Sequence, residues 1–190
     1  MQTGPHSTLR LGITGHRPHR LRVPVAVLLS RVRAVIAQFA NSEGAQGPVE
    51  IVTALAEGAD TIAAHAALQA GCRLSVVIPF SARDYETTFS DSAHGPVFRA
   101  LLDKADRTLV LPGSLDQSQA AYEAVGLATL EACDIVLTIW DGGPAQGRGG
   151  TPEILEAALA HDMAVIWIDA VEDRAPRVLR APAGSTGTLL

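Results

Sequence analysis

The residues with the clearest chemical potential lie in a glycine-rich stretch that follows a buried apolar run. The run Ile135–Trp140 ends at Asp141, and the backbone beyond it is freed by Gly142, Gly143, Gly147, Gly149 and Gly150. Thr151 and the proline after it are typical of an N-cap and a first helical turn. The bare amides and positive dipole end of such a helix favour a phosphate or carboxylate. Turn geometry alone is the competing explanation for the glycines.

A second candidate group follows the first predicted strand. Gly15 permits a tight turn there, and His16 and Arg17 offer donors to a phosphate or a base. The Arg17 guanidinium could hold a phosphate through two parallel hydrogen bonds. The alternatives are that Arg17 is a solvated surface charge and that His16 only packs or caps the turn.

A third group follows the second strand, where Gly58 opens a helix and leaves its first-turn amides bare. This arrangement predicts a second anion site. Asp60 could contact a ribose hydroxyl directly. Alternatively, Glu57 and Asp60 only complement the helix dipole.

Aromatic residues gather after the third strand, in a chain that is only 4% aromatic. Phe80 and Tyr85 could form a wall against which a base stacks. They could equally belong, with Phe89, to a hydrophobic cluster under a long loop. Tyr122, on the helix before the glycine-rich strand, is expected in the core.

The elements that position these residues alternate along the chain. Apolar runs predict strands over residues 9–14, 50–54, 73–79, 107–111, 134–140 and 164–169, and helical periods predict helices over 24–40, 58–70, 95–105, 119–132 and 152–161. The pattern indicates a doubly wound, Rossmann-like α/β domain with a mainly parallel sheet. Ligands of such sheets bind beyond the carboxyl ends of the strands. Gly15, Gly58 and the turn at 149–151 should therefore converge on one cleft.

Length and composition narrow the class of protein. The 190 residues, 47% of them hydrophobic, predict one domain over residues 8–170 and a loosely held tail over 171–190. No apolar run suits a membrane span and the N-terminus does not resemble a signal peptide, so a cytoplasmic location is expected. The net charge of −5 argues against nucleic acid as a partner. Cys72 and Cys133 suggest reduced thiols, and no metal motif is present. Ala-rich helices could pack across a homodimer or a higher homo-oligomer, but helix-on-sheet packing uses Ala as readily.

Three ordered motifs are similar to those of the SLOG superfamily, which unites the Smf/DprA proteins with the LOG (Lonely Guy, formerly "lysine decarboxylase-like") proteins. They are Gly12-Ile-Thr-Gly-His-Arg17, Ala54-Leu-Ala-Glu-Gly-Ala-Asp-Thr-Ile-Ala-Ala-His65 and Trp140-Asp-Gly followed by Gly149-Gly-Thr-Pro-Glu153. The resemblance covers about residues 8–169. It implies a Rossmann-like domain that binds a nucleotide or nucleotide derivative, with its phosphate on the glycine-rich loop. No further cofactor is implied.

The resemblance also raises an enzymatic alternative. LOG enzymes hydrolyse the N-glycosidic bond of a cytokinin riboside 5′-monophosphate with an Arg and the last Glu of their loop motif. Here Ile154 stands where that Glu is expected, so Glu153 or Asp141 would have to act, and Arg17 or Arg148 would anchor the phosphate. We therefore expect a nucleotide-binding, sensor-type domain first, a phosphoribohydrolase second and a ligand-free scaffold third.

Overall fold

A single seven-stranded sheet organises the chain. The computed structural model describes residues 8–41, 47–144 and 149–181. The strands are β1 (Leu9–Gly15), β2 (Val49–Thr53), β3 (Arg73–Ile78), β4 (Arg107–Val110), β5 (Ile135–Trp140), β6 (Ala164–Asp169) and β7 (Arg177–Arg180). Their order is β4-β3-β2-β1-β5-β6-β7, and only β7 is antiparallel to its neighbour.

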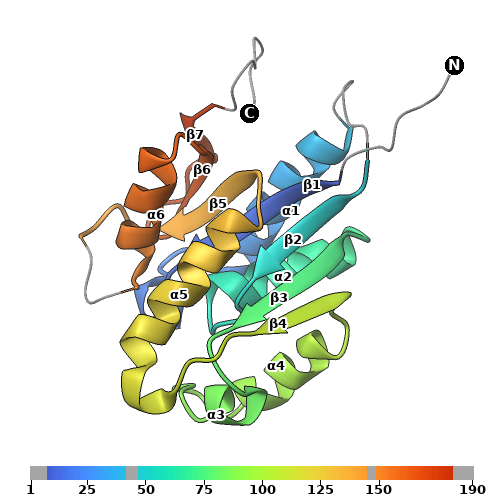
Figure 1. The fold of residues 1–190 in the computed structure, drawn as a ribbon. Helices are drawn as coiled ribbons and strands as arrows, with labels where there is room; N and C mark the ends of the chain where they lie inside the picture. Colours follow the sequence, from blue (N-terminus) through green and yellow to red (C-terminus); the bar gives the residue numbers. More distant parts are fainter. Residues whose placement is uncertain (1–7, 42–46, 145–148, 182–190) are drawn as a thin grey trace, which may run out of the picture.

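Helices cover both faces of this sheet (Figure 1). They are α1 (Val25–Asn41), α2 (Ala59–Gln69), α3 (Ala82–Glu86), α4 (His94–Leu102), α5 (Ser118–Glu131) and α6 (Thr151–Ala160), with short 3₁₀ turns η1 (Pro18–Arg20) and η2 (Leu115–Gln117). Helices α1 and α2 pack together on one face, and α5 and α6 pack together on the other. The predicted doubly wound α/β fold is therefore confirmed. Within the described ranges no helix is long and apolar enough to cross a membrane.

The strand order reverses at β1. This strand pairs with β2 on one side and with β5 on the other, with Gly15 opposite Ile139 at its carboxyl end. The chain leaves β1 toward the face covered by α1 and leaves β5 toward the face covered by α6, so a crevice opens between the carboxyl ends of β1 and β5. The loops after β1 and β5 carry two of the candidate groups identified in the sequence.

The central strands are buried because helices cover both of their sides. All five residues of β2 are buried, as are the first five of β5. Near-continuous apolar strands are typical of such parallel sheets. The main core also takes in Leu28, Val32 and Ile36 of α1.

The predicted elements are confirmed with small shifts at their ends. The largest shift is at α4, which ends at Leu102 and not at residue 105. Two elements were not predicted: the five-residue helix α3 and the strand β7. Strand β7 lies in the stretch expected to be a loose tail, where Trp167 of β6 pairs with Arg177 and its ring lies 4.2 Å from that guanidinium.

Candidate functional site

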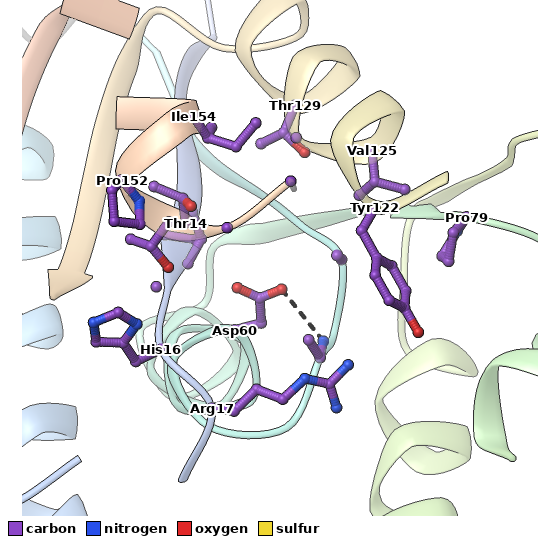
Figure 2. Close-up of a pocket in the computed structure, with 18 of the residues that line it drawn as sticks. Thr14, His16, Arg17, Asp60, Pro79, Tyr122, Val125, Thr129, Pro152 and Ile154 are labelled. Atoms are coloured by element: carbon purple, nitrogen blue, oxygen red, sulfur yellow. Dashed lines mark hydrogen bonds between the residues drawn. The ribbon is translucent and has the colours of Figure 1, made fainter. Parts of the chain in front are cut away.

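A pocket of about 400 Å³ lies at the carboxyl edge of the sheet, where β1 and β5 diverge (Figure 2). Its walls come from the turn after β1, the loop between β2 and α2, the first turns of α5 and the start of α6. Gly15 and Gly149–Thr151 line it, although they are far apart in the sequence, whereas Gly58 does not. Two of the three turns predicted to converge therefore meet at this cavity, and ligand binding remains a prediction.

The turn after β1 is fixed by a carboxylate that follows β5. His16 Nε2 lies 2.8 Å from Asp141 Oδ1, and Arg20 Nη2 lies 2.6 Å from Asp141 Oδ2. The amide of Gly143 also donates to Asp141, at 2.9 Å. Burial opposes ionisation of Asp141, but hydrogen bonds from His16, Gly143 and Arg20 outweigh it and lower its pKa to about 2. Burial lowers the pKa of His16, which therefore remains neutral at pH 7.

Arg17 is held by a buried acid. Its Nη1 donates to Glu57 Oε2 at 2.9 Å, and the Glu57 side chain is only 2% exposed. Burial works against the charge of Glu57, but donors from Ser90, Asp91 and Arg17 outweigh it and lower the pKa of this carboxyl. The Arg17 guanidinium lies 6.0 Å from the centre of the Tyr122 ring, within the range of a cation–π contact. Arg17 is thus positioned at the pocket and is not a freely solvated charge.

The start of α2 does not offer the second anion site predicted from the sequence. The amide of Ala59 donates to the carbonyl oxygen of His16 at 3.0 Å, so the chain after β1 covers the helix end. Gly58 does not line the pocket. It has φ +94°, and a Cβ there would lie 2.5 Å from the His16 carbonyl oxygen. Its role is therefore to let two loops approach each other closely.

Asp60 instead brings a carboxyl into the pocket, with 6% of the residue exposed. Its Oδ2 accepts from the amide of Ala56 at 3.3 Å. Burial raises the pKa of Asp60 to about 7 against the opposing effects of Ala56, Arg17, Ala54 and Thr53. The loop in front of it includes Leu55, which is fully buried with φ +55°. A non-glycine residue rarely adopts this conformation, which costs about 1–2 kcal/mol.

The glycine-rich loop presents a small set of amides at the start of α6. Gly149, with φ +75°, donates its amide to Glu153 Oε2 at 2.6 Å. The amides of Glu153 and Ile154 donate to the Gly150 carbonyl oxygen, and Pro152 has no N–H. Gly150 and Thr151 both line the pocket, and their amides have no acceptor within the helix. In the described part of this loop they are therefore the amides available to a ligand.

The carboxylates considered for catalysis are engaged within the protein. Glu153 caps the amide of Gly149, and Asp141 holds His16 and Arg20. Asp141, Gly142 and Glu153 do not line the pocket. Arg148 lies outside the described residues. The structure therefore does not bring the expected carboxylates to the cavity.

The aromatic wall is built differently from the prediction. Phe80 and Tyr85 are each 2% exposed and pack edge to face, with 5.9 Å between ring centres. Phe80 belongs to the core and does not line the pocket, because α3 and α4 close over the end of β3. Tyr85 does line the pocket, but its ring is buried in the same core. Tyr122, expected in the core, is the half-buried ring at the pocket, and Figure 2 shows it along one side of the cavity.

Helix α5 is the part of the site that sequence reasoning missed. Gln119, Tyr122, Val125, Gly126 and Thr129 all line the pocket. A signal for this was available, since a helix that follows a parallel strand begins at the carboxyl edge of the sheet. Gly126 also lets α6 approach, because a Cβ there would lie 2.3 Å from Ile154 Cδ1. Among the described residues, no group of three or more His, Cys, Asp or Glu could hold a metal ion.

Comparison with known proteins identifies the fold. No protein-family model and no curated protein matches the chain. Among solved structures, DNA processing protein A (DprA) from Streptococcus pneumoniae matches with a TM-score of 0.58 and 22% identity, over 84% of this chain and 50% of that one. The chain thus spans half the length of that protein. A molybdenum cofactor binding protein from Rippkaea orientalis matches with a TM-score of 0.52 and 16% identity, over 86% of this chain and 77% of that one.

These neighbours confirm the Rossmann-like fold that the three motifs predict. DprA from Helicobacter pylori, described for its single-stranded DNA binding mode, also matches, with a TM-score of 0.50 and 15% identity over 84% of this chain and 64% of that one. The expectation that excluded nucleic acid is therefore wrong. It relied on a net charge of −5, and a protein of this fold binds single-stranded DNA.

Proposed function

We propose that this chain is a ligand-binding domain that takes a nucleoside monophosphate or a similar phosphorylated ring compound. The observation that carries the proposal is one pocket at the reversal of strand order that combines helix-start amides, a fixed guanidinium and an aromatic ring. Pockets that bind small molecules typically pair an apolar lining with a few convergent polar groups.

The phosphate would bind at the start of α6. The amides of Gly150 and Thr151 would donate to its oxygens, and the positive end of the helix dipole would favour its charge. Arg20, whose guanidinium also pairs with Asp141, lines the same pocket. A phosphate there would thus face the two amides and a guanidinium.

The ring of the ligand would occupy the side of the pocket lined by Tyr122, Pro79 and Val125. Figure 2 shows Tyr122 and Pro79 on one side of the cavity, with His16 and Pro152 on the opposite side. Arg17, held by Glu57, would approach the ligand from below the ring. Its planar guanidinium can contact both a ring face and a phosphate oxygen.

The structural neighbours support ligand recognition by this fold without naming the ligand. One is a molybdenum cofactor binding protein, and another binds single-stranded DNA. A nucleoside monophosphate is the simplest probe that combines a phosphate with a ring, and it is the repeating unit of single-stranded nucleic acid.

A pair of substitutions at Gly150 tests the proposal. Its φ of −76° suits proline, so Gly150→Pro removes one amide donor, whereas Gly150→Ala retains it. Calorimetry with AMP, GMP and ribose 5-phosphate should show about ten- to hundredfold weaker binding for the Pro variant than for the Ala variant. Equal affinities would rule out the phosphate site at α6. A short single-stranded oligonucleotide that binds where no monophosphate does would replace the proposal by DNA binding.

A further inference from the structure

A buried carboxyl at the centre of the pocket is unusual, because Asp60 is the one acidic residue among the described residues that line it. Asp60 is 6% exposed and lines the cavity. Figure 2 shows its carboxyl directed into the cavity, and the dashed line at one oxygen is the hydrogen bond from the Ala56 amide. The helix dipole does not require such burial, since a first-turn carboxylate can complement it from the surface.

The groups around Asp60 favour a carboxylate that accepts hydrogen bonds. The amide of Ala56 donates to Oδ2 at 3.3 Å, and Thr53 and Ala54 lie close enough to favour the ionised form. The loop that supplies these groups holds Leu55 in a left-handed conformation. Strain of this kind persists only where surrounding structure enforces it, and it clusters at binding and active sites.

We propose that Asp60 makes the pocket selective for rings with two adjacent N–H donors, such as the 2-amino-4-oxopyrimidine edge shared by guanine nucleotides and pterins. This inference rests on the proposed function. The two ligand donors would bind the acceptor positions of the carboxylate that face the cavity, beside the donors that Ala56, Ala54 and Thr53 already supply. A phosphate on the same ligand would reach the amides at the start of α6.

The same geometry disfavours adenine. An ionised carboxylate only accepts hydrogen bonds, and adenine presents a ring-nitrogen acceptor beside its amino donor. That acceptor would face a carboxylate oxygen and leave both without a donor. Hypoxanthine has one ring N–H but no 2-amino group, so IMP should rank between GMP and AMP. Sites built around hydrogen bonds reject analogues that lack the matching group.

Selectivity should depend on pH because the carboxyl must be ionised to accept both donors. The charged and titratable groups that interact with Asp60 are Arg17 on the turn after β1 and Tyr85 on α3, and Tyr85 in turn interacts with Tyr122 on α5 and with Glu57 before α2. With the Asp60 pKa near 7, about one molecule in ten has the ionised form at pH 6 and nine in ten at pH 8. The affinity for GMP should thus fall about tenfold from pH 8 to pH 6. AMP carries the same phosphate, so the pH dependence of AMP binding measures the part that comes from titration of the phosphate.

The experiment is calorimetry of the whole chain with GMP, IMP, AMP, 6-hydroxymethylpterin phosphate and ribose 5-phosphate at pH 8 and pH 6. We expect GMP to bind at least about tenfold more tightly than AMP at pH 8, with a smaller ratio at pH 6. The stronger of GMP and the pterin phosphate identifies the source of the ring. Equal affinity and equal pH dependence for GMP, IMP and AMP, with ribose 5-phosphate still bound, would overturn the inference and leave the proposed function intact. No binding of any probe would overturn both.

Asp60→Asn provides a second test. An amide both donates and accepts, so this variant should lose the preference for GMP and its pH dependence while binding ribose 5-phosphate as the wild type does. Asp106→Asn is the matched control, since Asp106 accepts from the amide of Leu74 and does not line the pocket. A retained GMP preference in Asp60→Asn would contradict the inference. If Asp60→Asn does not fold, the ratio of GMP to AMP affinity in the wild type at pH 8 and pH 6 still tests the inference.

Discussion

His16 and Asp141 are joined by a hydrogen bond of 2.8 Å although they lie 125 positions apart in the sequence. The bond exists because β1 and β5 are neighbours and end at the same edge of the sheet. Since the pKa of His16 is lowered, its neutral ring must carry the proton on Nε2 to donate to the carboxylate. This bond fixes the turn from which Arg17 and Arg20 extend, and so it shapes one wall of the pocket.

Removing the Asp141 carboxylate should destabilise the protein. Asp141→Ala leaves the His16 ring and the Arg20 guanidinium, which is 16% exposed, without their acceptor. We expect a loss of about 2–4 kcal/mol in the free energy of unfolding, measured with urea. Asp134→Ala is the control, because that carboxylate accepts from the amide of Arg10 at an exposed position and should cost less than about 1 kcal/mol. Equal losses would show that the His16–Asp141–Arg20 contacts add nothing.

Removing the Arg17 side chain should weaken nucleotide binding. Arg17→Ala deletes a charge-assisted donor, so we expect a loss of about 1.5–3 kcal/mol, or roughly ten- to hundredfold in affinity by calorimetry. Arg10→Ala is a matched control, since Arg10 also pairs with a buried glutamate, Glu50, but does not line the pocket. A loss of affinity in both variants would indicate a general effect of lost stability.

The contribution of Asp60 to the free energy of unfolding of the free protein should decline as pH rises from about 4 to 7. Its folded pKa of about 7 lies above the unfolded value of 3.8, so in this interval the folded state binds the extra proton. The stability it contributes is complete below about pH 4 and is lost by about pH 7, with a slope of up to about 1.4 kcal/mol per pH unit. Urea unfolding of wild type and Asp60→Asn from pH 4 to 8 measures this difference. Parallel curves would contradict it.

The fold could be predicted because apolar strands and Ala-rich helices alternate with little ambiguity. The edge at which Gly15 and Gly149–Thr151 meet follows from parallel strand direction alone, whereas the prediction that Gly58 also lines this cavity was wrong. Strand β7 was missed because its residues are mostly exposed and it pairs antiparallel beyond the regular alternation.

Individual side-chain roles could not be predicted in the same way. Whether Phe80 or Tyr122 reaches the cavity depends on how α3 and α4 close over the end of β3, which is a matter of tertiary packing. Asp141 also looked free in the sequence, since its partner His16 is distant along the chain. The spacing of residues along the sequence predicts where strands end. It does not predict which donors and carboxylates are already hydrogen-bonded within the folded protein.

Removing the charge of Glu153 should have a small effect. Glu153→Gln retains an oxygen that can accept from the amide of Gly149, so we expect a loss of only a few tenths to about 1 kcal/mol in stability and unchanged nucleotide affinity. Chromatography of AMP and GMP after incubation should show no free base from wild type or variant. Base release by the wild type that is lost in Glu153→Gln would instead establish the phosphoribohydrolase alternative.

Two glycines with left-handed backbones allow conformational strain and steric contact to be separated. Gly58 has φ +94° with ψ −119°, and Gly71 has φ +70°, so alanine at either position should cost about 1 kcal/mol or more through the backbone alone. A Cβ at Gly71 meets nothing within 4 Å, whereas one at Gly58 would lie 2.5 Å from the His16 carbonyl oxygen. That oxygen is backbone and accepts from the amide of Ala59, so it cannot move without releasing the turn after β1.

We therefore expect Gly71→Ala to lose about 1 kcal/mol and to bind nucleotide as the wild type does. Gly58→Ala should lose at least about 2–3 kcal/mol, because a steric clash adds to the strain. Its nucleotide affinity should also fall, because Arg17 and His16 belong to the displaced turn. Urea unfolding and calorimetry on both variants measure these effects. If Gly58→Ala matched Gly71→Ala in stability and in affinity, the close approach of α2 to the turn after β1 would not be what holds this side of the pocket in place.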